Sequence, residues 1–291
     1  MTEIRPSRPE ELPAQKALWK TAFGDEDRYI DWFYTCCGTE HMLLLLEDGR
    51  LASMLALLPH GLTLPGGGTA RGYYVYALAT DPAARSKGYG RQLLRAAGEH
   101  AAKLGGDCVT VVPAEASLFK FFGTVGFDAA FFHREVELLH DQAVPARPGD
   151  RVEPISPAEY NALQARLLEG APAVTYGEEL IRYQEGMSRL ASGGLYRVEA
   201  GGVEGCAAVE YRDAESVLFK ELLISPEQMS GALAVFAGVL PGRRCFVRTP
   251  ACWAGMKGSY IQPFGMIRWL NGVLARQWRE ESLGYMGLGF D

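Results

Sequence analysis

The sequence lacks most features of secreted, membrane-bound and nucleic-acid-binding proteins. Its apolar runs are short, such as MLLLL at 42–46, so we expect no membrane-spanning helix. Its first residues lack the basic and then apolar pattern of a signal peptide. The 35 Asp and Glu residues outnumber the 29 Lys and Arg residues, and a net charge of −6 argues against a nucleic-acid-binding face. These absences predict a cytoplasmic protein with neither a membrane nor a nucleic-acid partner.

Cysteine and histidine are also scarce, with 6 and 5 residues among 291. The cysteines show no metal-ligand or disulfide-framework spacing, and Cys36 and Cys37 are adjacent. We therefore expect reduced thiols and no metal site. The length suits two domains, and a content of 48% hydrophobic and 22% charged residues is typical of a globular protein.

The first half of the chain alternates strand-like and helix-like segments, which predicts a mixed α/β (α+β) fold. Expected helices cover residues 9–23, 26–34, the segment between a glycine-rich loop at 85–90 and residue 104, and 115–122. Expected strands cover residues 41–46, 51–58, 72–80, 108–112 and 131–139. Asp48-Gly49 between the first two strands predicts a hairpin.

The second half repeats this plan more weakly, after a proline-rich linker at 141–157. We expect strands at 195–200, 203–212, 216–224 and 244–248, and a helix at 226–240. Residues 225–230 (SPEQMS) stand where the first half has its glycine-rich loop. The sequence therefore predicts domains at 1–140 and 158–291, with a single anion site in the first.

The segment 85–90 (RSKGYG) is the strongest indication of a ligand. It joins an apolar strand to a helix, so that several backbone N–H groups can point at one spot. The helix dipole and the side chains of Arg85 and Lys87 add positive potential, which suits a pyrophosphate. A dinucleotide-binding motif fits less well, because Leu93 stands where its third glycine belongs.

Residues 76–90 (YALATDPAARSKGYG) resemble the central motif of the GNAT superfamily of acyl-CoA-dependent N-acyltransferases, with Arg85, Gly88 and Gly90 at its defining positions. Residues 115–127, which end in Gly-Phe, resemble a later segment of that family. The tandem layout is similar to acetyltransferases of the enhanced-intracellular-survival type, without their sterol-carrier-like domain. The resemblance implies a GNAT-type fold, with helices flanking a mixed central sheet, and a second, degenerate GNAT-like domain.

The resemblance also implies an acetyl-CoA site in the first domain. The backbone around Leu78 would pair with the pantetheine arm like an added strand, and an N–H there would polarise the thioester carbonyl. The N–H groups of the glycine-rich loop would hold the pyrophosphate. The implied cofactor-binding residues are Leu78, Ala79, Thr80, Arg85, Ser86, Lys87, Gly88, Tyr89, Gly90 and Ser117.

One catalytic position departs from the family pattern. Many members place a proton-donating tyrosine five residues before the phenylalanine of Gly-Phe, where this chain has Phe122. Another group then protonates the leaving thiolate, or the thiolate leaves unaided, or the chain binds without catalysis. Tyr73, Tyr74 and Tyr76 are the nearest candidates, with Tyr74 and Tyr76 on one strand face, and aromatic packing is their alternative role. Glu115 is a candidate base or acceptor-binding group, or else a carboxylate favoured by the helix dipole.

We expect an acetyl-CoA-dependent N-acetyltransferase that acts on a small-molecule amine. The alternative is a non-catalytic acyl-CoA-binding module, such as a sensor or an assembly subunit. A homo-oligomer stays open. We expect His133, which follows the Gly-Phe turn, to be a surface or hydrogen-bonded residue rather than a base.

Overall fold

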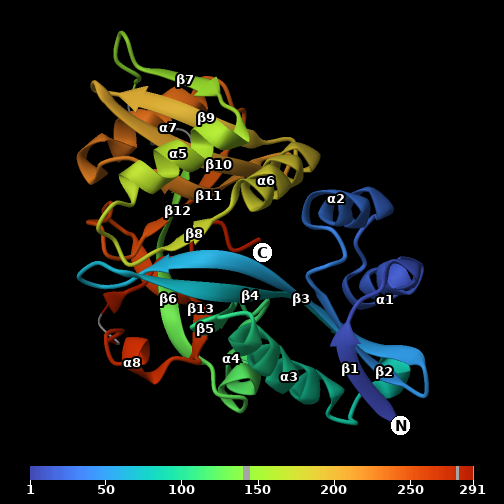
Figure 1. The fold of residues 1–291 in the computed structure, drawn as a ribbon. Helices are drawn as coiled ribbons and strands as arrows, with labels where there is room; N and C mark the ends of the chain where they lie inside the picture. The colour runs from blue at the N-terminus through green and yellow to red at the C-terminus, as the bar shows by residue number, and fades with distance from the viewer. Residues whose placement is uncertain (140–144, 280–281, 291) are drawn as a thin grey trace. The chain divides into compact units, whose positions relative to one another are not determined.

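The computed structural model describes residues 1–139, 145–279 and 282–290 (Figure 1). These residues form two compact units. The first unit comprises Met1–Leu64, Gly68–Ala129 and Gly265–Arg279, and the second comprises Pro65–Gly67, Ala130–Phe264 and the described C-terminal residues. The predicted division at residue 140 differs from this partition, because most of β6 (Asp128–Leu139) lies in the second unit and the end of β13 (Tyr260–Trp269) lies in the first.

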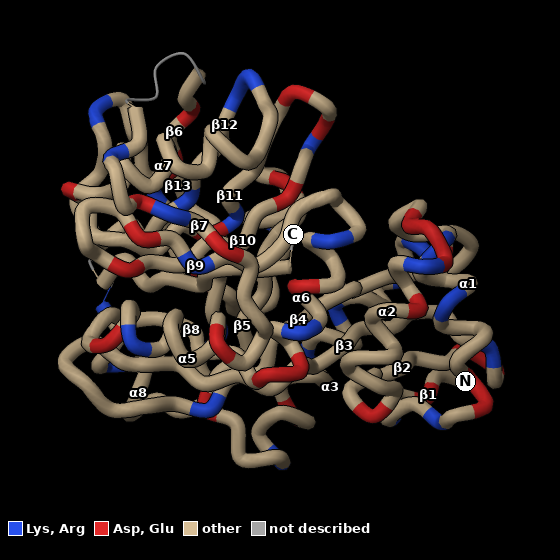
Figure 2. The backbone as a smooth tube through the Cα atoms, turned by 90° about the horizontal axis from the view of Figure 1, so that it is seen from above, with Lys and Arg blue, Asp and Glu red and all other residues tan. Residues whose placement is uncertain are grey.

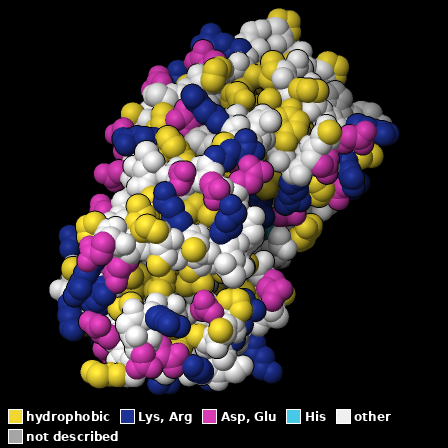
Figure 3. All heavy atoms as spheres, turned by 90° about the vertical axis from the view of Figure 1, so that its right-hand side faces the viewer, with side chains coloured by type: hydrophobic (Ala, Val, Ile, Leu, Met, Phe, Trp, Pro, Cys, Tyr) yellow, Lys and Arg dark blue, Asp and Glu magenta, His cyan; other side chains and the backbone are white. Residues whose placement is uncertain are grey.

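Charged side chains of both signs are interspersed along the chain. Figure 2 shows Lys and Arg scattered along the backbone together with Asp and Glu, and Figure 3 shows them intermingled on one face. That face therefore presents mixed charge rather than a single sign. Among the described residues, no helix is both long and apolar enough to cross a membrane.

The first unit is a mixed sheet with helices on both faces. Its strands lie in the order β1-β2-β3-β4-β5-β13, and β4 and β5 are parallel while the other neighbours are antiparallel. In chain order its elements are β1 (Thr2–Pro6), η1 (Pro9–Glu11), α1 (Leu12–Phe23), α2 (Asp27–Cys37), β2 (Met42–Glu47), β3 (Arg50–Thr63), β4 (Thr69–Thr80), η2 (Pro82–Ala84), α3 (Tyr89–Lys103), β5 (Cys108–Val111), α4 (Ala116–Gly123), the end of β13 and α8 (Gly272–Ala275).

Local sequence signals account for two of these connections. Asp48 (φ 49°) and Gly49 (φ 76°) both adopt the left-handed region between antiparallel β2 and β3, as a two-residue hairpin requires. Helix α3 ends at Lys103 and is followed by Gly105 in a left-handed conformation (φ 77°). The predicted hairpin and the predicted helix end are therefore both found.

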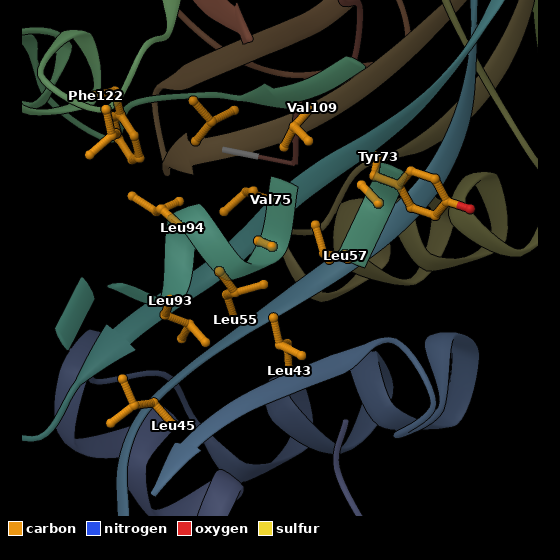
Figure 4. Packing of buried hydrophobic residues seen from close by; sticks show 14 of the residues in the cluster. Leu43, Leu45, Leu55, Leu57, Tyr73, Val75, Leu93, Leu94, Val109 and Phe122 are labelled. Carbon is orange, nitrogen blue, oxygen red and sulfur yellow. The ribbon is translucent and has the colours of Figure 1, made fainter. Parts of the chain in front are cut away.

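The side chains of β4 alternate between the two faces of the sheet, and different helices cover each face. Tyr73 belongs to the apolar cluster that α3 and α4 cover (Figure 4). Tyr74 and Tyr76 point to the opposite face, where the Tyr76 ring lies 5.8 Å from Trp19 of α1 and 5.7 Å from Phe33 of α2. The predicted placement of these three tyrosines on two faces is confirmed.

The second unit is a sheet with the strand order β6-β12-β11-β10-β9-β7. Besides β6, its elements are β7 (Arg151–Pro154), α5 (Pro157–Leu167), β8 (Val174–Tyr176), α6 (Glu178–Leu190), β9 (Gly194–Ala200), β10 (Val203–Asp213), β11 (Ser216–Leu223), η4 (Pro226–Gln228), α7 (Met229–Ala237), β12 (Arg244–Pro250) and the start of β13. The four predicted strands and the predicted helix correspond to β9, β10, β11, β12 and α7 with its preceding η4 turn.

The predicted linker at 141–157 contains regular structure. Strand β7 pairs with β9 inside this range, and Pro157 is the first residue of α5. The Ser156 hydroxyl accepts from the Glu159 N–H, and the Glu159 carboxylate accepts from the Ser156 N–H, so this proline follows a helix N-cap. The proline content therefore reflects a helix start as well as a connection. Residues 140–144 of the predicted linker lie outside the described residues.

Both units contain the same arrangement of two parallel strands that pair over a short stretch. In the first unit Gly72–Val75 pairs with Cys108–Val111, and in the second Ser216–Phe219 pairs with Arg244–Val247. In each unit, the first strand of the parallel pair, β4 or β11, contains a β-bulge shortly after its paired stretch. The predicted repeat of the plan is therefore a repeat of the fold. In the second unit the strand leads into the Pro226–Gln228 turn instead of a glycine-rich loop.

A buried histidine joins β3 to β5 across the paired end of β4. His60 Nε2 lies 2.9 Å from Thr110 Oγ1, and Nδ1 lies 2.9 Å from the Gly61 carbonyl oxygen. A Cβ atom at Gly72 would overlap the His60 ring, so only glycine leaves room for it. Because the Gly61 carbonyl can only accept, Nδ1 carries the proton and Nε2 accepts from Thr110. The site needs a neutral imidazole.

This geometry predicts that His60 makes the protein less stable in mild acid. Burial lowers the pKa of His60 to about 4, while an unfolded histidine has a pKa of about 6.5. Between these values the unfolded chain takes up a proton that the native chain does not, so the free energy of unfolding falls as pH falls. We expect a loss of about 3 kcal/mol from pH 6.5 to 4, measured by urea denaturation. His60→Gln should remove this part of the pH dependence, and an unchanged slope would contradict the assignment.

Candidate functional site

The pairing between strands β4 and β5 ends about halfway along β4. Their pairing ends at Val75 and Val111, whereas β4 continues to Thr80. Over residues 76–80, the pairing found among the described residues is with β3 alone. Pro113 soon follows β5 and has no N–H to extend the ladder. The second half of β4 therefore presents an edge that β5 does not cover.

A β-bulge shapes this uncovered edge. The β4 partners of Met54 and Ala56 are three residues apart, so Ala77 and Leu78 share one opposing residue in β3. Ala77 has a φ of 49°, which is uncommon for a residue with a side chain. A bulge re-aims the backbone groups beside it, and this one lies at the point where β4 leaves β5.

Thr80 directs its backbone N–H to the uncovered edge. The Asp81 N–H donates to the Ala52 carbonyl of β3 at 2.9 Å, and the Ser53 hydroxyl donates to the Ala79 carbonyl at 2.7 Å. Residues 79 and 81 therefore face β3. Because successive residues of a strand direct their backbone groups to opposite sides, Thr80 faces the other edge. An extended ligand could pair there as an additional strand.

The loop after β4 has the backbone form of an anion-binding nest. Asp81 begins η2 by accepting from the Ala83 N–H at 2.8 Å. Ser86 (φ 65°) and Gly88 (φ 77°) then adopt left-handed conformations on either side of Lys87. Such a sequence of conformations turns neighbouring N–H groups to one side, and the first N–H groups of the following helix have no carbonyl partner within it. The loop and the start of α3 can therefore donate to one anion.

The two glycines of the loop, Gly88 and Gly90, differ in what favours glycine at their positions. Gly88 has a positive φ, and a Cβ there would meet nothing within 4 Å, so its backbone conformation is what favours glycine. At Gly90, neither the backbone conformation nor crowding within the chain favours glycine. Its φ is not in the left-handed region, and a Cβ there would make only ordinary contacts of 3.7 Å to Thr80 Oγ1 and 4.0 Å to Phe121. A ligand that approached the backbone closely would be a reason for glycine at this position, and that role of Gly90 stays a prediction.

The two cations of the loop lie in different surroundings. Lys87 Nζ lies 2.9 and 2.8 Å from the two carboxylate oxygens of Glu47, at the end of β2. The Tyr89 hydroxyl donates to the same carboxylate at 2.5 Å. These two donors lower the pKa of the Glu47 carboxyl. Arg85 is exposed and extends the loop with a second positive charge.

Glu115 and Ser117 lie together at the start of α4. The Ser117 hydroxyl donates to the Glu115 carboxylate at 2.6 Å, and both residues are exposed. Glu115 occupies the N-cap position of α4 in extended conformation, without a cap hydrogen bond from its side chain. The carboxylate is thus available to a ligand as well as to the helix dipole. Its role as a base, and that of Ser117 in cofactor binding, stay predictions.

Phe122 lies in the apolar core of the first unit. It is 4% exposed, and its ring lies 5.3 Å from that of Phe121 and 5.8 Å from that of Phe127. Figure 4 shows it within the cluster formed by α3 and the sheet. The position where the family often carries a proton-donating tyrosine is therefore both apolar and buried.

The two tyrosines predicted as catalytic groups lie in an aromatic cluster. Tyr74 is 2% exposed, and its ring lies 5.9 Å from that of Tyr76. Tyr76 is half-buried against the aromatic rings of α1 and α2. The packing role that we gave as the alternative is therefore observed for both, and their catalytic role stays a prediction.

His133 belongs to a buried polar network in the second unit. Its Nε2 lies 2.7 Å from Gln262 Nε2 and 3.3 Å from a carboxylate oxygen of Glu135, which also lies 3.4 Å from Arg248 Nε. The hydrogen bond from His133 and the charge of Arg248 lower the pKa of Glu135 to about 2. The expectation that His133 is a hydrogen-bonded residue is confirmed.

Sequence reasoning missed two contacts of the site. Glu47 directly precedes the predicted Asp48-Gly49 turn, and no local pattern connects it to Lys87, 40 residues later. The hydroxyl of Ser53 lies 2.9 Å from that of Thr80 as well as donating to the Ala79 carbonyl. A serine inside the apolar strand LASMLALL was the available signal for this second contact.

Comparison with known proteins identifies the class of the first unit. Residues 3–129 match the family model described as an acetyltransferase (GNAT) domain. The chain therefore carries a GNAT acetyltransferase domain over these residues. No curated protein matches the chain in sequence.

Solved structures share the fold of nearly the whole chain. A GCN5-related N-acetyltransferase from Anabaena variabilis has a TM-score of 0.78 at 14% identity, covering 96% of this chain and 75% of its own. One from Kribbella flavida has a TM-score of 0.70 at 12% identity, covering 96% and 74%. Eis1 from Mycobacterium abscessus has a TM-score of 0.67 at 15% identity, covering 92% and 73%. The chain is thus similar in fold to tandem-domain acetyltransferases of the Eis type, and these identities carry the likeness no further than the fold.

Proposed function

We propose that this chain transfers the acetyl group of acetyl-CoA to the amine of a small molecule. The observation that carries the proposal is the continuity of two features in the first unit. The uncovered edge of β4 at 76–80 leads directly into the nest-forming loop at 85–90. An extended pantetheine arm suits the first feature and a pyrophosphate suits the second.

The proposed binding mode gives the residues of β4 and those of the following loop different tasks. Backbone groups of Leu78 and Thr80 pair with the pantetheine arm, and an N–H near Leu78 polarises the thioester carbonyl. The backbone groups of Ala79, which we also predicted to bind the cofactor, face β3 instead. The N–H groups from Ser86 to Gly90 hold the pyrophosphate, and Arg85 adds a charge-assisted hydrogen bond. The reacting thioester then lies beside the bulge rather than at the loop.

The transfer makes two proton demands. The amine nitrogen attacks the thioester carbonyl carbon, a C–N bond forms, and the C–S bond breaks to release CoA thiolate. The attacking amine must lose one proton, and the thiolate gains one. Glu115 is our proposed acceptor of the first. For the second, Tyr74 and Tyr76 are proposed in place of the tyrosine that Phe122 replaces, and solvent is the remaining source.

The test of the proposal is release of free CoA thiol from acetyl-CoA over a panel of aminoglycosides, polyamines, amino acids and peptide N-termini. We expect thiol release that depends on one class of amine and on the concentration of the chain. Tight binding of acetyl-CoA without turnover on any amine would contradict the enzymatic part of the proposal.

A second candidate function is a non-catalytic acyl-CoA-binding module, which the apolar surroundings of Phe122 favour. Both candidates share the cofactor site and differ only in turnover. A chain of this second kind would be stabilised by acetyl-CoA and would release no thiol.

The variant Phe122→Tyr separates these candidates. Its hydroxyl enters an apolar cluster, so we expect the free energy of unfolding to fall by about 1–2 kcal/mol in urea denaturation. A gain in thiol release despite this loss would argue against the binding-only function. Phe122→Leu is the matched control, because it perturbs the same cluster without adding a proton donor.

A further inference from the structure

One carboxylate receives two side chains of the glycine-rich loop. Lys87 Nζ contacts both oxygens of Glu47, at 2.9 and 2.8 Å, and the Tyr89 hydroxyl donates to one of them at 2.5 Å. Glu47 is the last residue of β2 and precedes the tight hairpin turn at Asp48. The carboxylate is therefore carried by a regular strand rather than by a second loop.

The two donors lie on either side of the left-handed Gly88. Tyr89 is 7% exposed, because its ring lies in the apolar cluster under α3, and its hydroxyl reaches out to Glu47. The Lys87 ammonium lies 5.7 Å from the centre of the same ring. The residues before and after the turn are thus both tied to β2. Glycine at the turn itself offers the backbone many conformations, so these two ties restrict it.

The charge of Glu47 and its contacts with the loop should change the affinity for a bound anion in opposite directions. A carboxylate beside a pyrophosphate site repels the ligand and neutralises Lys87, so electrostatics alone predicts tighter binding once Glu47 is made neutral. If instead the carboxylate holds the loop in its nest-like form, its removal loosens the N–H groups and weakens binding. The two effects differ in sign, which makes the choice measurable.

We propose that Glu47 is a positioning residue that holds the loop at 85–90 in the form that binds the pyrophosphate of acetyl-CoA. This inference rests on the proposed function. It assigns the Glu47 contacts of Lys87 and Tyr89 to the shape of the loop rather than to direct recognition of the ligand.

The variant Tyr89→Phe tests this role without changing any charge. It keeps the buried ring and the Lys87–Glu47 pair, and removes only the hydroxyl that donates to Glu47. We expect its Kd for acetyl-CoA to rise about threefold to tenfold in calorimetric titration, as one lost hydrogen bond implies. Glu47→Gln should shift the Kd in the same direction. Asp48→Asn, which removes an equal charge from the neighbouring residue of the same hairpin, should leave binding unchanged or slightly tighter.

Two further readouts distinguish loop positioning from a general loss of structure. S-acetylpantetheine lacks the pyrophosphate, so its Kd should be the same for the wild type, Tyr89→Phe and Glu47→Gln. Amide hydrogen exchange in the free chain should quicken at residues 86–90 in both variants and stay unchanged in β3. Acetyl-CoA binding by Glu47→Gln that equals or exceeds the wild type would overturn the positioning role while leaving the proposed function intact. Failure of the wild type to bind acetyl-CoA would overturn both.

Discussion

Replacing Gly90 with alanine should make the free chain more stable and yet weaken acetyl-CoA binding by about tenfold or more. Gly90 is the second residue of α3, where alanine is favoured over glycine by about 0.5–1 kcal/mol. The added Cβ meets only ordinary contacts inside the chain, the nearest at 3.7 Å. In the proposed binding mode, however, it would lie in the space through which a phosphate reaches the backbone N–H groups. Thermal unfolding and calorimetric titration of the same variant measure the two effects.

The matched control for this variant is Gly272→Ala. Gly272 is the first residue of helix α8, and a Cβ there would meet nothing within 4 Å. The stability of the Gly272→Ala variant should change in the same direction as that of Gly90→Ala, with no change in acetyl-CoA affinity. Equal affinities for wild type and Gly90→Ala would show that no ligand approaches the backbone at this point.

Reversing the charge of Arg85 should remove most of the affinity for acetyl-CoA. Arg85→Glu replaces a charge-assisted hydrogen bond to the pyrophosphate by repulsion, and we expect a loss of about a hundredfold or more. The thermal stabilisation that acetyl-CoA gives the wild type should then disappear at ligand concentrations that saturate it. Arg85 is exposed, so the stability of the free chain should change little.

Arg95→Glu is the control for this charge reversal. Arg95 is an exposed residue farther along α3, and its reversal changes the net charge by the same amount. A local role of Arg85 predicts that Arg95→Glu keeps nearly all of the affinity. Equal losses in the two variants would mean that the overall field of the chain, and not a contact at the loop, attracts the ligand.

The parts of the site that the sequence predicted are those encoded in one continuous stretch. Strand β4, the loop at 85–90 and helix α3 follow one another, and each carries its own signal, from apolar alternation to the glycines and the helical spacing of leucines. The uncovered edge of β4 was harder to predict from the sequence, because it depends on where β5 ends. Pro113 marks that end, but only the pairing register shows that β4 continues beyond it.

What the sequence did not predict depends on contacts between distant segments. The His60 ring fits because Gly72 leaves room for it, and Glu47 meets Lys87 because a hairpin returns beside the loop. Neither pair has a local pattern, since each partner is unremarkable in its own segment. The partition into units differs from the predicted boundary for a similar reason, because the end of β13 joins the first unit by pairing with β5.

A calorimetric titration with acetyl-CoA is the sharpest test of this cofactor site, because it counts sites as well as measuring affinity. We expect one site per chain, lost in Arg85→Glu and weakened in Gly90→Ala, since the second unit has the Pro226–Gln228 turn in place of the nest-forming loop. A stoichiometry of two, or wild-type affinity in both variants, would contradict the placement of the cofactor on β4 and its loop.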